Sequence, residues 1–302
     1  MKYIIFLFFS LFTHFSFAST VPELTPKAIF REFYSDKDMF PLYFSEEEKE
    51  EYQLNGLSYV GIREKKEEYA LIYHGVYPYQ NHLGEKRYLI ALEQKVISDT
   101  DGSGYGFPDT CHACNSTTHL ISFKEHPNTG YKLLAKAQFK NGSYGNSSLF
   151  KGYGESSIFK EYDENAGSVL ENGIRNIVKL GNDKVGFFYE DAYMSQGFYS
   201  GFLSVIILSE NKIQSLEVTE HEGQPGYEED YPLFYSFKST WSVDESNPDL
   251  AYYPIKVRFT GEYYNEKLKK PRIMNKNITE IYVYDPANRN HKYKLKYTEP
   301  NQ

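Results

Sequence analysis

Residues 177–189 read IVKLGNDKVGFFY, in which two short apolar runs flank a polar turn at 181–184. Two strands joined by a four-residue turn rich in Gly, Asn and Asp form a β-hairpin. A third apolar run, at 198–208, follows after a short polar break. We therefore expect consecutive antiparallel strands in this part of the chain.

The same pattern recurs on both sides of this hairpin. Runs rich in Tyr, Ile, Phe and Leu are separated by clusters of Pro, Asn, Asp and Gly, which are typical of turns. These runs lie at 69–77, 87–97, 119–124, 131–139, 214–220, 233–243, 255–263, 279–284 and 292–297. No helical period lies between them, which argues against parallel βαβ units. The sequence predicts a mainly β fold, an antiparallel sandwich or a barrel-like sheet.

The N-terminal part of the chain has a helical pattern instead. Thr25 precedes Pro26, which places a capping hydroxyl before a proline suited to the first helical position. Ser45 and Glu48 have the spacing of a capping box, which predicts a second short helix at 45–53. A short helical N-terminal segment should therefore precede the strands.

These patterns divide the chain into three parts. We expect a signal peptide at 1–18, a helical N-terminal segment at 19–55 and a β-rich domain at 56–302. A subdivision of the β-rich domain near residue 225 is the alternative. The stretch 140–173, rich in Gly, Ser, Asn and Glu, should be a long irregular excursion.

The first of these parts has the pattern of a secretory signal. Lys2 supplies a positive charge, an apolar run at 3–12 follows, and Ser16 and Ala18 place small residues before the expected cleavage point. The run is shorter than the roughly 20 apolar residues that span a bilayer, and an uncleaved anchor is the alternative. The sequence thus predicts an exported protein, periplasmic or secreted. No later apolar run is long enough to cross a membrane, so the mature protein should be soluble.

The composition limits the classes of partner. The formal net charge is −8, from 33 basic and 41 acidic residues, and nucleic-acid binding needs a basic face. We therefore expect no nucleic-acid partner. The 29 tyrosines and 22 phenylalanines argue against a disordered chain. Tyrosine could also stack on sugars, although it suits strands equally well, so a protein or a glycan is the expected kind of ligand.

The two cysteines, Cys111 and Cys114, form a C-H-A-C motif that has three interpretations. In an oxidising compartment a local disulfide is the leading one. The second is a redox-active dithiol, with His112 lowering a thiol pKa, but the helix that usually follows such motifs is missing. The third is a zinc half-site completed by His112, His119, His126 or Asp109. A haem attachment is excluded because no His follows the second cysteine directly.

An acidic loop precedes the cysteine pair and could hold calcium. Asp99, Asp101 and Ser103 stand at alternate positions before a glycine, as in the first half of a calcium-binding loop. The acid expected at the twelfth position is missing, and Asp109 would have to substitute for it. The alternative is a polar turn that uses Asp and Gly for their backbone preferences. No cofactor is expected beyond a calcium or zinc ion at these sites.

The chain resembles a group of exported bacterial proteins to which no activity is assigned. The resemblance covers about residues 105–208 and rests on the C-H-A-C motif before a strand, Gly-Ser-Tyr-Gly at 142–145 and the segment 179–187, with further similarity at 196–201. It implies export and a β-rich fold. It supplies no activity, cofactor or catalytic residue.

The sequence contains no nucleophile-elbow, metalloprotease, P-loop or dinucleotide-binding motif. We therefore expect an exported, soluble, β-rich protein with a binding or envelope-associated role and a Cys111–Cys114 disulfide. The alternative is a periplasmic enzyme, thiol–disulfide or metal-dependent, that uses the C-H-A-C motif.

Overall fold

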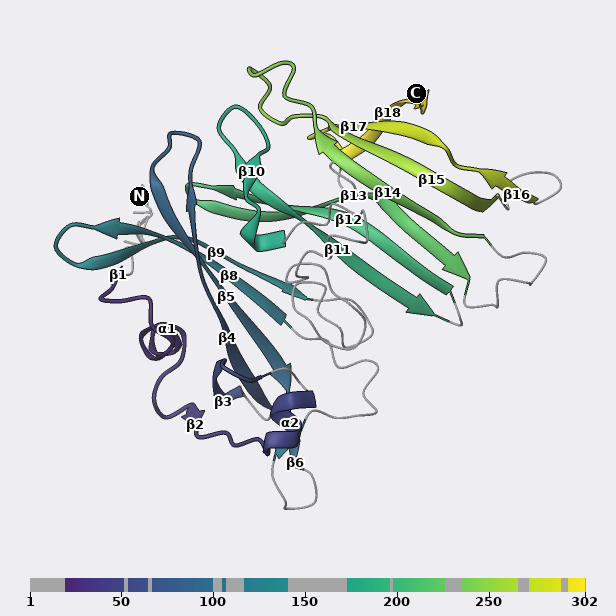
Figure 1. The fold of residues 1–302 in the computed structure, drawn as a ribbon. Helices are drawn as coiled ribbons and strands as arrows, with labels where there is room; N and C mark the ends of the chain where they lie inside the picture. The colour runs from purple at the N-terminus through teal and green to yellow at the C-terminus, as the bar shows by residue number, and fades with distance from the viewer. Residues whose placement is uncertain are drawn as a thin grey trace, which may run out of the picture.

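The structure is a computed structural model. It describes residues 20–51, 54–64, 67–99, 105–106, 117–140, 173–195, 198–225, 235–265, 272–288 and 293–301. The fold is mainly β and consists of antiparallel sheets, one of which is a curled half-barrel (Figure 1). Its helical content is small and lies near the N-terminus. The predicted fold class is therefore confirmed.

The first sheet, which we call sheet 1, is built from the N-terminal half of the chain. All of its neighbouring strands are antiparallel. Its order is β1 (Thr20–Val21), β9 (Gly130–Lys140), β8 (Thr117–His126), β5 (Lys86–Val96), β4 (Glu67–Gln80), β3 (Ser58–Glu64) and β2 (Met39–Phe40). A separate two-stranded ladder joins β6 (Ser98–Asp99) to β7 (Tyr105–Gly106).

The second sheet, sheet 2, is built from the C-terminal half. It begins with the hairpin that the sequence predicts: Lys179 pairs with Val185, and the amide of Leu180 donates to the carbonyl of Lys184 at 2.9 Å. Its order is β10 (Val178–Lys179), β11 (Val185–Ser195), β12 (Phe198–Ser209), β13 (Lys212–Pro225), β14 (Phe237–Val243), β15 (Ile255–Asn265), β17 (Ile278–Tyr284) and β18 (Tyr293–Pro300), with β16 (Arg272–Asn275) on β15.

The two expected helices lie before β3, interspersed with the two-residue strands β1 and β2. Helix α1 (Pro26–Phe33) starts at the predicted cap, where the Thr25 side chain accepts from the amide of Ala28 at 3.4 Å. Helix α2 (Glu46–Glu51) falls inside the predicted range. A 3-10 turn, η1 (Gly173–Arg175), precedes sheet 2. Helix α1 lies against the face of sheet 1 that points away from sheet 2 (Figure 1).

Sheet 2 curls on itself into the half-barrel. The Tyr282 hydroxyl of β17 lies 2.7 Å from Thr219 Oγ1 of β13, although β14 and β15 separate these strands in the sheet. Neighbouring strands in a flat sheet are about 4.8 Å apart, and β13 and β17 are three such spacings apart in the strand order. The contact between the two hydroxyls therefore requires strong curvature of the sheet. The inner face is lined by one apolar cluster that includes Val205, Val257 and Phe259.

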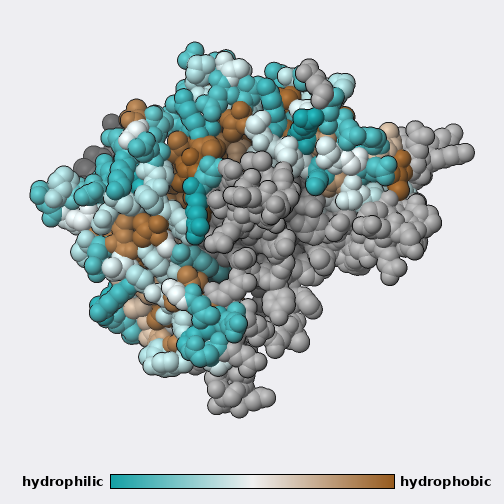
Figure 2. All heavy atoms as spheres, in the orientation of Figure 1, coloured by the Kyte–Doolittle hydropathy of each residue, from teal (hydrophilic) through white to brown (hydrophobic). Residues whose placement is uncertain are grey.

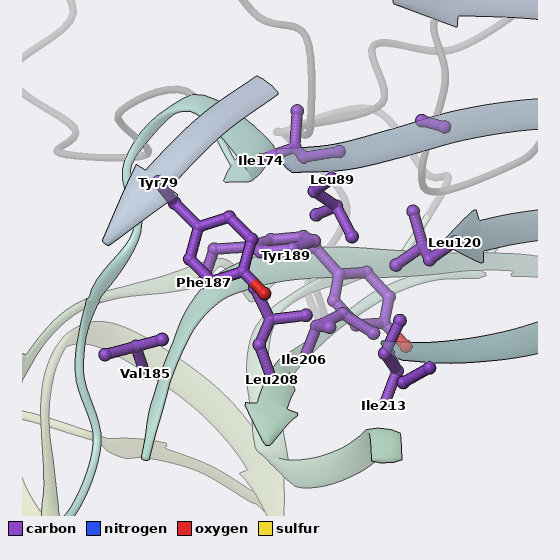
Figure 3. Packing of buried hydrophobic residues seen from close by; sticks show 12 residues of the cluster. Tyr79, Leu89, Leu120, Ile174, Val185, Phe187, Tyr189, Ile206, Leu208 and Ile213 are labelled. Atoms are coloured by element: carbon purple, nitrogen blue, oxygen red, sulfur yellow. The ribbon is translucent and has the colours of Figure 1, made fainter. Parts of the chain in front are cut away.

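Strand alternation lets β11–β13 serve two cores at once. Ile207 points into the half-barrel, whereas Ile206 and Leu208 point to sheet 1. Figure 3 shows Phe187 and Tyr189 of sheet 2 packed toward Tyr79 and other sheet 1 residues. The two sheets therefore share a buried core.

The residues that connect the last strand of sheet 1 to η1, 141–172, are outside the described ranges. Strands before and after residue 225 belong to the same sheet, because Gly223 of β13 pairs with Phe237 of β14. Among the described helices, none has the length and apolar composition to cross a membrane.

Candidate functional site

Most of the site residues predicted from the sequence lie outside the described part of the chain. Both cysteines of the C-H-A-C motif and four neighbours are in this group: Cys111, Cys114, Asp101, Ser103, Asp109 and His112. Asp99 lies in β6, where the structure describes the backbone only. The described chain resumes at Thr117, which pairs with Gln94 of β5. Within the described residues, no group of three or more His, Cys, Asp or Glu side chains could hold a metal ion.

Two predicted site residues have described side chains: His126, which is exposed at the end of β8, and His119. His119 lies in β8, is 8% exposed and faces the α1 side of sheet 1 with Ile121 and Phe123. Its Nε2 lies 3.0 Å from Gln94 Oε1, and its Nδ1 lies 3.3 Å from Gln138 Nε2. These amide partners suit a neutral ring that donates from Nε2 and accepts at Nδ1. Burial, reinforced by Lys136, lowers the pKa of His119 to about 4.

The opposite face of sheet 1 carries a buried charged cluster that the sequence analysis missed. Glu93 of β5 is 1% exposed, and its Oε2 lies 3.2 Å from His74 Nε2. Its Oε1 lies 3.5 Å from Lys95 Nζ. Burial lowers the pKa of His74, while the hydrogen bond to Glu93 opposes that shift. A β-bulge at Gly75, with φ at 137°, places His74 over Glu93.

This cluster has two possible uses. A buried carboxylate is costly unless other charges and hydrogen bonds compensate it, and His74 with Lys95 provides that compensation. An imidazole next to a carboxylate is also an acid–base pair of the kind that enzymes use. In the sequence, the sign of this cluster was Glu93, an acidic residue inside the apolar run of 87–97.

A second polar group lies on the inner face of the half-barrel, around Lys276 in the turn between β16 and β17. Lys276 Nζ lies 3.7 Å from the centroid of the Phe237 ring and 4.0 Å from that of Phe259. A third ring, Tyr263, is 5.8 Å away. These contacts are cation–π interactions. Within the described chain the Lys276 ammonium has ring contacts and no hydrogen bond to oxygen.

The local fold places Lys276 there. The backbone amide of Lys276 donates to the carbonyl of Gly261 at 2.8 Å, and the Asn277 side chain accepts from the Gly261 amide at 3.1 Å. Gly261 has φ at 114°, and a Cβ there would lie 2.2 Å from the carbonyl oxygen of Ser236. Only glycine suits this position. This junction brings the turn onto the start of β14 and the part of β15 that pairs with it.

Two carboxylates accompany the lysine. Burial lowers the pKa of Lys276, and the charges of Glu280 and Glu220 oppose this shift. The Tyr282 hydroxyl donates to Glu280, and burial together with this bond raises the pKa of Tyr282. Glu220 lies beside Phe237, since a Cβ built on Gly223 would be 3.4 Å from Glu220 Oε1 and 2.7 Å from Phe237 Cε1.

Ser239 completes this group. It lies in β14 between Phe237 and Trp241, both of which pack in the half-barrel core, so strand alternation points it to the same inner face. It pairs with Phe259 of β15. Ser239 is 9% exposed, and its buried hydroxyl has no hydrogen-bond partner among the described residues. A buried polar group without a partner costs stability and needs an explanation.

We call Lys276, Ser239, Glu220, Glu280 and the rings of Phe237, Phe259 and Tyr263 the half-barrel site. It combines hydrogen-bond donors, carboxylate acceptors and aromatic walls, a composition typical of ligand-binding sites. This combination of groups is suited to binding a ligand. No sequence signal pointed to Lys276, because Asn275-Lys276-Asn277 has the composition of an ordinary turn.

The face of the molecule drawn in Figure 2 has no large continuous apolar area over its described residues. Hydrophobic residues form separate patches there among hydrophilic ones. Large side chains that are exposed come from several distant elements: Tyr43, Leu83, Leu250, Leu295 and Tyr297. On that face, scattered apolar residues are normal for a protein surface.

Comparisons with protein-family models, with curated proteins and with solved structures found no match to this chain.

Proposed function

We propose that this chain is an exported, soluble, β-rich binding protein that holds its ligand at the half-barrel site. The observation that carries the proposal is the buried Ser239 hydroxyl, which has no partner among the described residues and lies on the same inner face as the Lys276 ammonium. Both groups are hydrogen-bond donors beside aromatic rings. A ligand with acceptor atoms would satisfy them, which would offset the cost of burying them.

The cysteine pair would have a structural role in this proposal. A Cys111–Cys114 disulfide closes a very small loop, worth roughly 2 kcal/mol in the chain-entropy model. It would brace the segment that leads into β8 at Thr117, next to the central strand β5. The bond would fix a turn rather than stabilise the whole fold.

Export is tested by locating the mature protein. We expect fractionation to recover it outside the cytoplasm, and mass spectrometry to find a chain that begins at Ser19. A variant with Leu7→Arg in the apolar run should keep the precursor in the cytoplasm. Recovery of the unprocessed wild-type chain in the cytoplasm would contradict the proposal.

The disulfide is tested by thiol titration of the purified, denatured protein. We expect no free thiol before reduction and two after it, from Cys111 and Cys114. The matched Cys111→Ser/Cys114→Ser protein should keep its fold by circular dichroism. Turnover of a model disulfide by the wild type, lost in this variant, would instead support a thiol–disulfide enzyme.

A further inference from the structure

We propose that the ligand of the half-barrel site is a neutral sugar residue of a glycan, bound by hydrogen bonds to Lys276, Ser239 and the two carboxylates beside the aromatic rings. This inference rests on the proposed function and adds the chemical class of the ligand. It follows from the charge of the site, its mixture of donors and acceptors, and its aromatic walls.

The charge of the site disfavours an anionic ligand. One ammonium, Lys276, faces two carboxylates, Glu220 and Glu280. The chain as a whole carries a formal net charge of −8. A carboxylate or phosphate ligand would therefore meet repulsion both near the site and at longer range.

The position of Lys276 disfavours a cationic ligand. Aromatic rings attract cations over their faces, and the Lys276 ammonium already lies within 4.0 Å of the Phe237 and Phe259 ring centroids. A second cation would have to displace this side chain or lie next to its charge. A neutral ligand avoids both costs.

The polar groups of the site suit hydroxyl groups. Lys276 and Ser239 can donate hydrogen bonds, whereas the Glu220 and Glu280 carboxylates can only accept them. A sugar hydroxyl donates one hydrogen bond and accepts others, so adjacent hydroxyls can satisfy both kinds of group at once. Lys276, Glu220 and Glu280 are only partly buried, so they border solvent where a ligand could reach them.

The Tyr263 ring suits the apolar face of a sugar ring. Tyr263 is partly buried and lies beside Lys276, whereas Phe237 and Phe259 are 4% and 0% exposed beneath the ammonium, so Tyr263 is the ring that a sugar can contact. Aromatic side chains offer a large apolar surface with a polar edge, which matches a ring that carries hydroxyls around an apolar face. Ligand sites typically combine such walls with a few polar groups.

The experiment is a binding titration on the full mature chain with three sets of probes. The neutral set contains glucose, galactose, mannose and N-acetylglucosamine with their short oligomers. The anionic set contains glucuronate and inorganic phosphate, and the cationic set contains glucosamine and tetramethylammonium. Trp241 is the single tryptophan and lies two residues from Ser239, so its fluorescence should report binding. Calorimetry provides an independent readout.

We expect a neutral sugar or oligomer to bind, and Lys276→Met to weaken that binding by at least about tenfold. Methionine keeps an apolar stem of similar length and removes the three N–H donors. The matched control is Lys256→Met, because Lys256 pairs with Asp244 at 3.0 Å and lies on β15 outside the site. Ser239→Ala, which leaves the rings and charges in place, should weaken binding independently of Lys276.

The possible failures are distinguishable. If an anionic or cationic probe binds in preference and Lys276→Met abolishes that binding, the sugar assignment is wrong and the binding proposal stands. Equal binding by the wild type and both site variants would place the ligand elsewhere and overturn both. If no probe binds and the variants alter only the unfolding midpoint, both proposals are contradicted.

Discussion

His119 shows how the surroundings of one side chain set its protonation. The folded protein binds a proton at His119 only near pH 4, because burial lowers its pKa from 6.5. Between these pH values the unfolded chain binds more protons than the folded one. The free energy of unfolding should therefore decrease as pH falls from about 6.5 to about 4, with a contribution of at most roughly 3 kcal/mol from this residue.

We expect His119→Gln to flatten this pH dependence, because glutamine cannot titrate. Urea unfolding at a series of pH values measures the change. The pKa of His74 is also lowered by burial, and His74 remains in the variant. The slope of His119→Gln should therefore be smaller than that of the wild type without vanishing. The control is His126→Gln, which removes an exposed histidine and should retain the wild-type slope because His119 remains. An unchanged slope in His119→Gln would contradict the assignment.

Ser239 provides a second prediction for a single residue. Its buried hydroxyl has no described partner in the unliganded protein, so Ser239→Ala should raise the free energy of unfolding by about 1 kcal/mol. Ser122→Ala is the contrasting variant, since the Ser122 hydroxyl lies 2.7 Å from the Tyr79 hydroxyl and its loss should destabilise. Guanidinium unfolding compares the two. Destabilisation of both by the same amount would show that Ser239 has a partner.

Among the elements, the turn between β12 and β13 is tied to the β4–β5 hairpin of sheet 1. Arg87 is 5% exposed, and its Nη2 donates to Glu210 at 2.9 Å and to Glu85 at 2.7 Å. Asn81 Nδ2 also donates to both carboxylates, at 2.8 Å each. A buried guanidinium needs such partners. These bonds join the β4–β5 hairpin of sheet 1 to the β12–β13 turn of sheet 2.

Glu210→Gln should therefore destabilise the protein by about 1 kcal/mol, because it removes a charge that compensates buried Arg87. Glu210 itself is about half exposed, so added salt should reduce the effect. The control is Glu262→Gln, which changes the net charge equally at an exposed position. Urea unfolding at low and high salt tests this. An equal decrease in the free energy of unfolding in both variants would exclude a specific contact between the two elements.

The elements that the sequence predicted best are those with strong local signals. The hairpin around 181–184 and the cap at Thr25 are set by turn and capping chemistry within a few residues, and both are confirmed. Strand β3 (Ser58–Glu64) was missed, because it contains a glycine and ends in charged residues. Its formation depends on pairing with β4 rather than on its own composition.

The half-barrel site could not be predicted for a different reason. Strand alternation predicts which face of the sheet Ser239 and Glu280 occupy, but it does not predict how strongly the sheet curves. The contact between Thr219 and Tyr282 spans two intervening strands and arises only from the curl. Apart from the backbone of Asp99, the predicted cysteine and calcium sites fall outside the described ranges, so they remain predictions.

At the scale of the whole molecule, one buried core joins the two sheets. Leu89 and Leu120 of sheet 1 pack in the same cluster as Phe187 and Ile206 of sheet 2 (Figure 3). Separating the sheets would expose this apolar surface to water at about 25 cal/mol per Å². The sheets should therefore unfold together, even though each has a further core of its own.

A variant far from the only tryptophan tests this cooperativity. Ile90 is fully buried on the α1 side of sheet 1, whereas Trp241 lies in β14 of sheet 2. Ile90→Ala should cost about 2–5 kcal/mol through lost burial and a cavity. If the molecule is one cooperative unit, Trp241 fluorescence and far-ultraviolet circular dichroism should shift to lower denaturant by the same amount. Val257→Ala in the half-barrel is the converse variant and should shift both probes together too. A fluorescence transition that Ile90→Ala leaves in place, while circular dichroism becomes biphasic, would mean that the half-barrel folds independently of sheet 1.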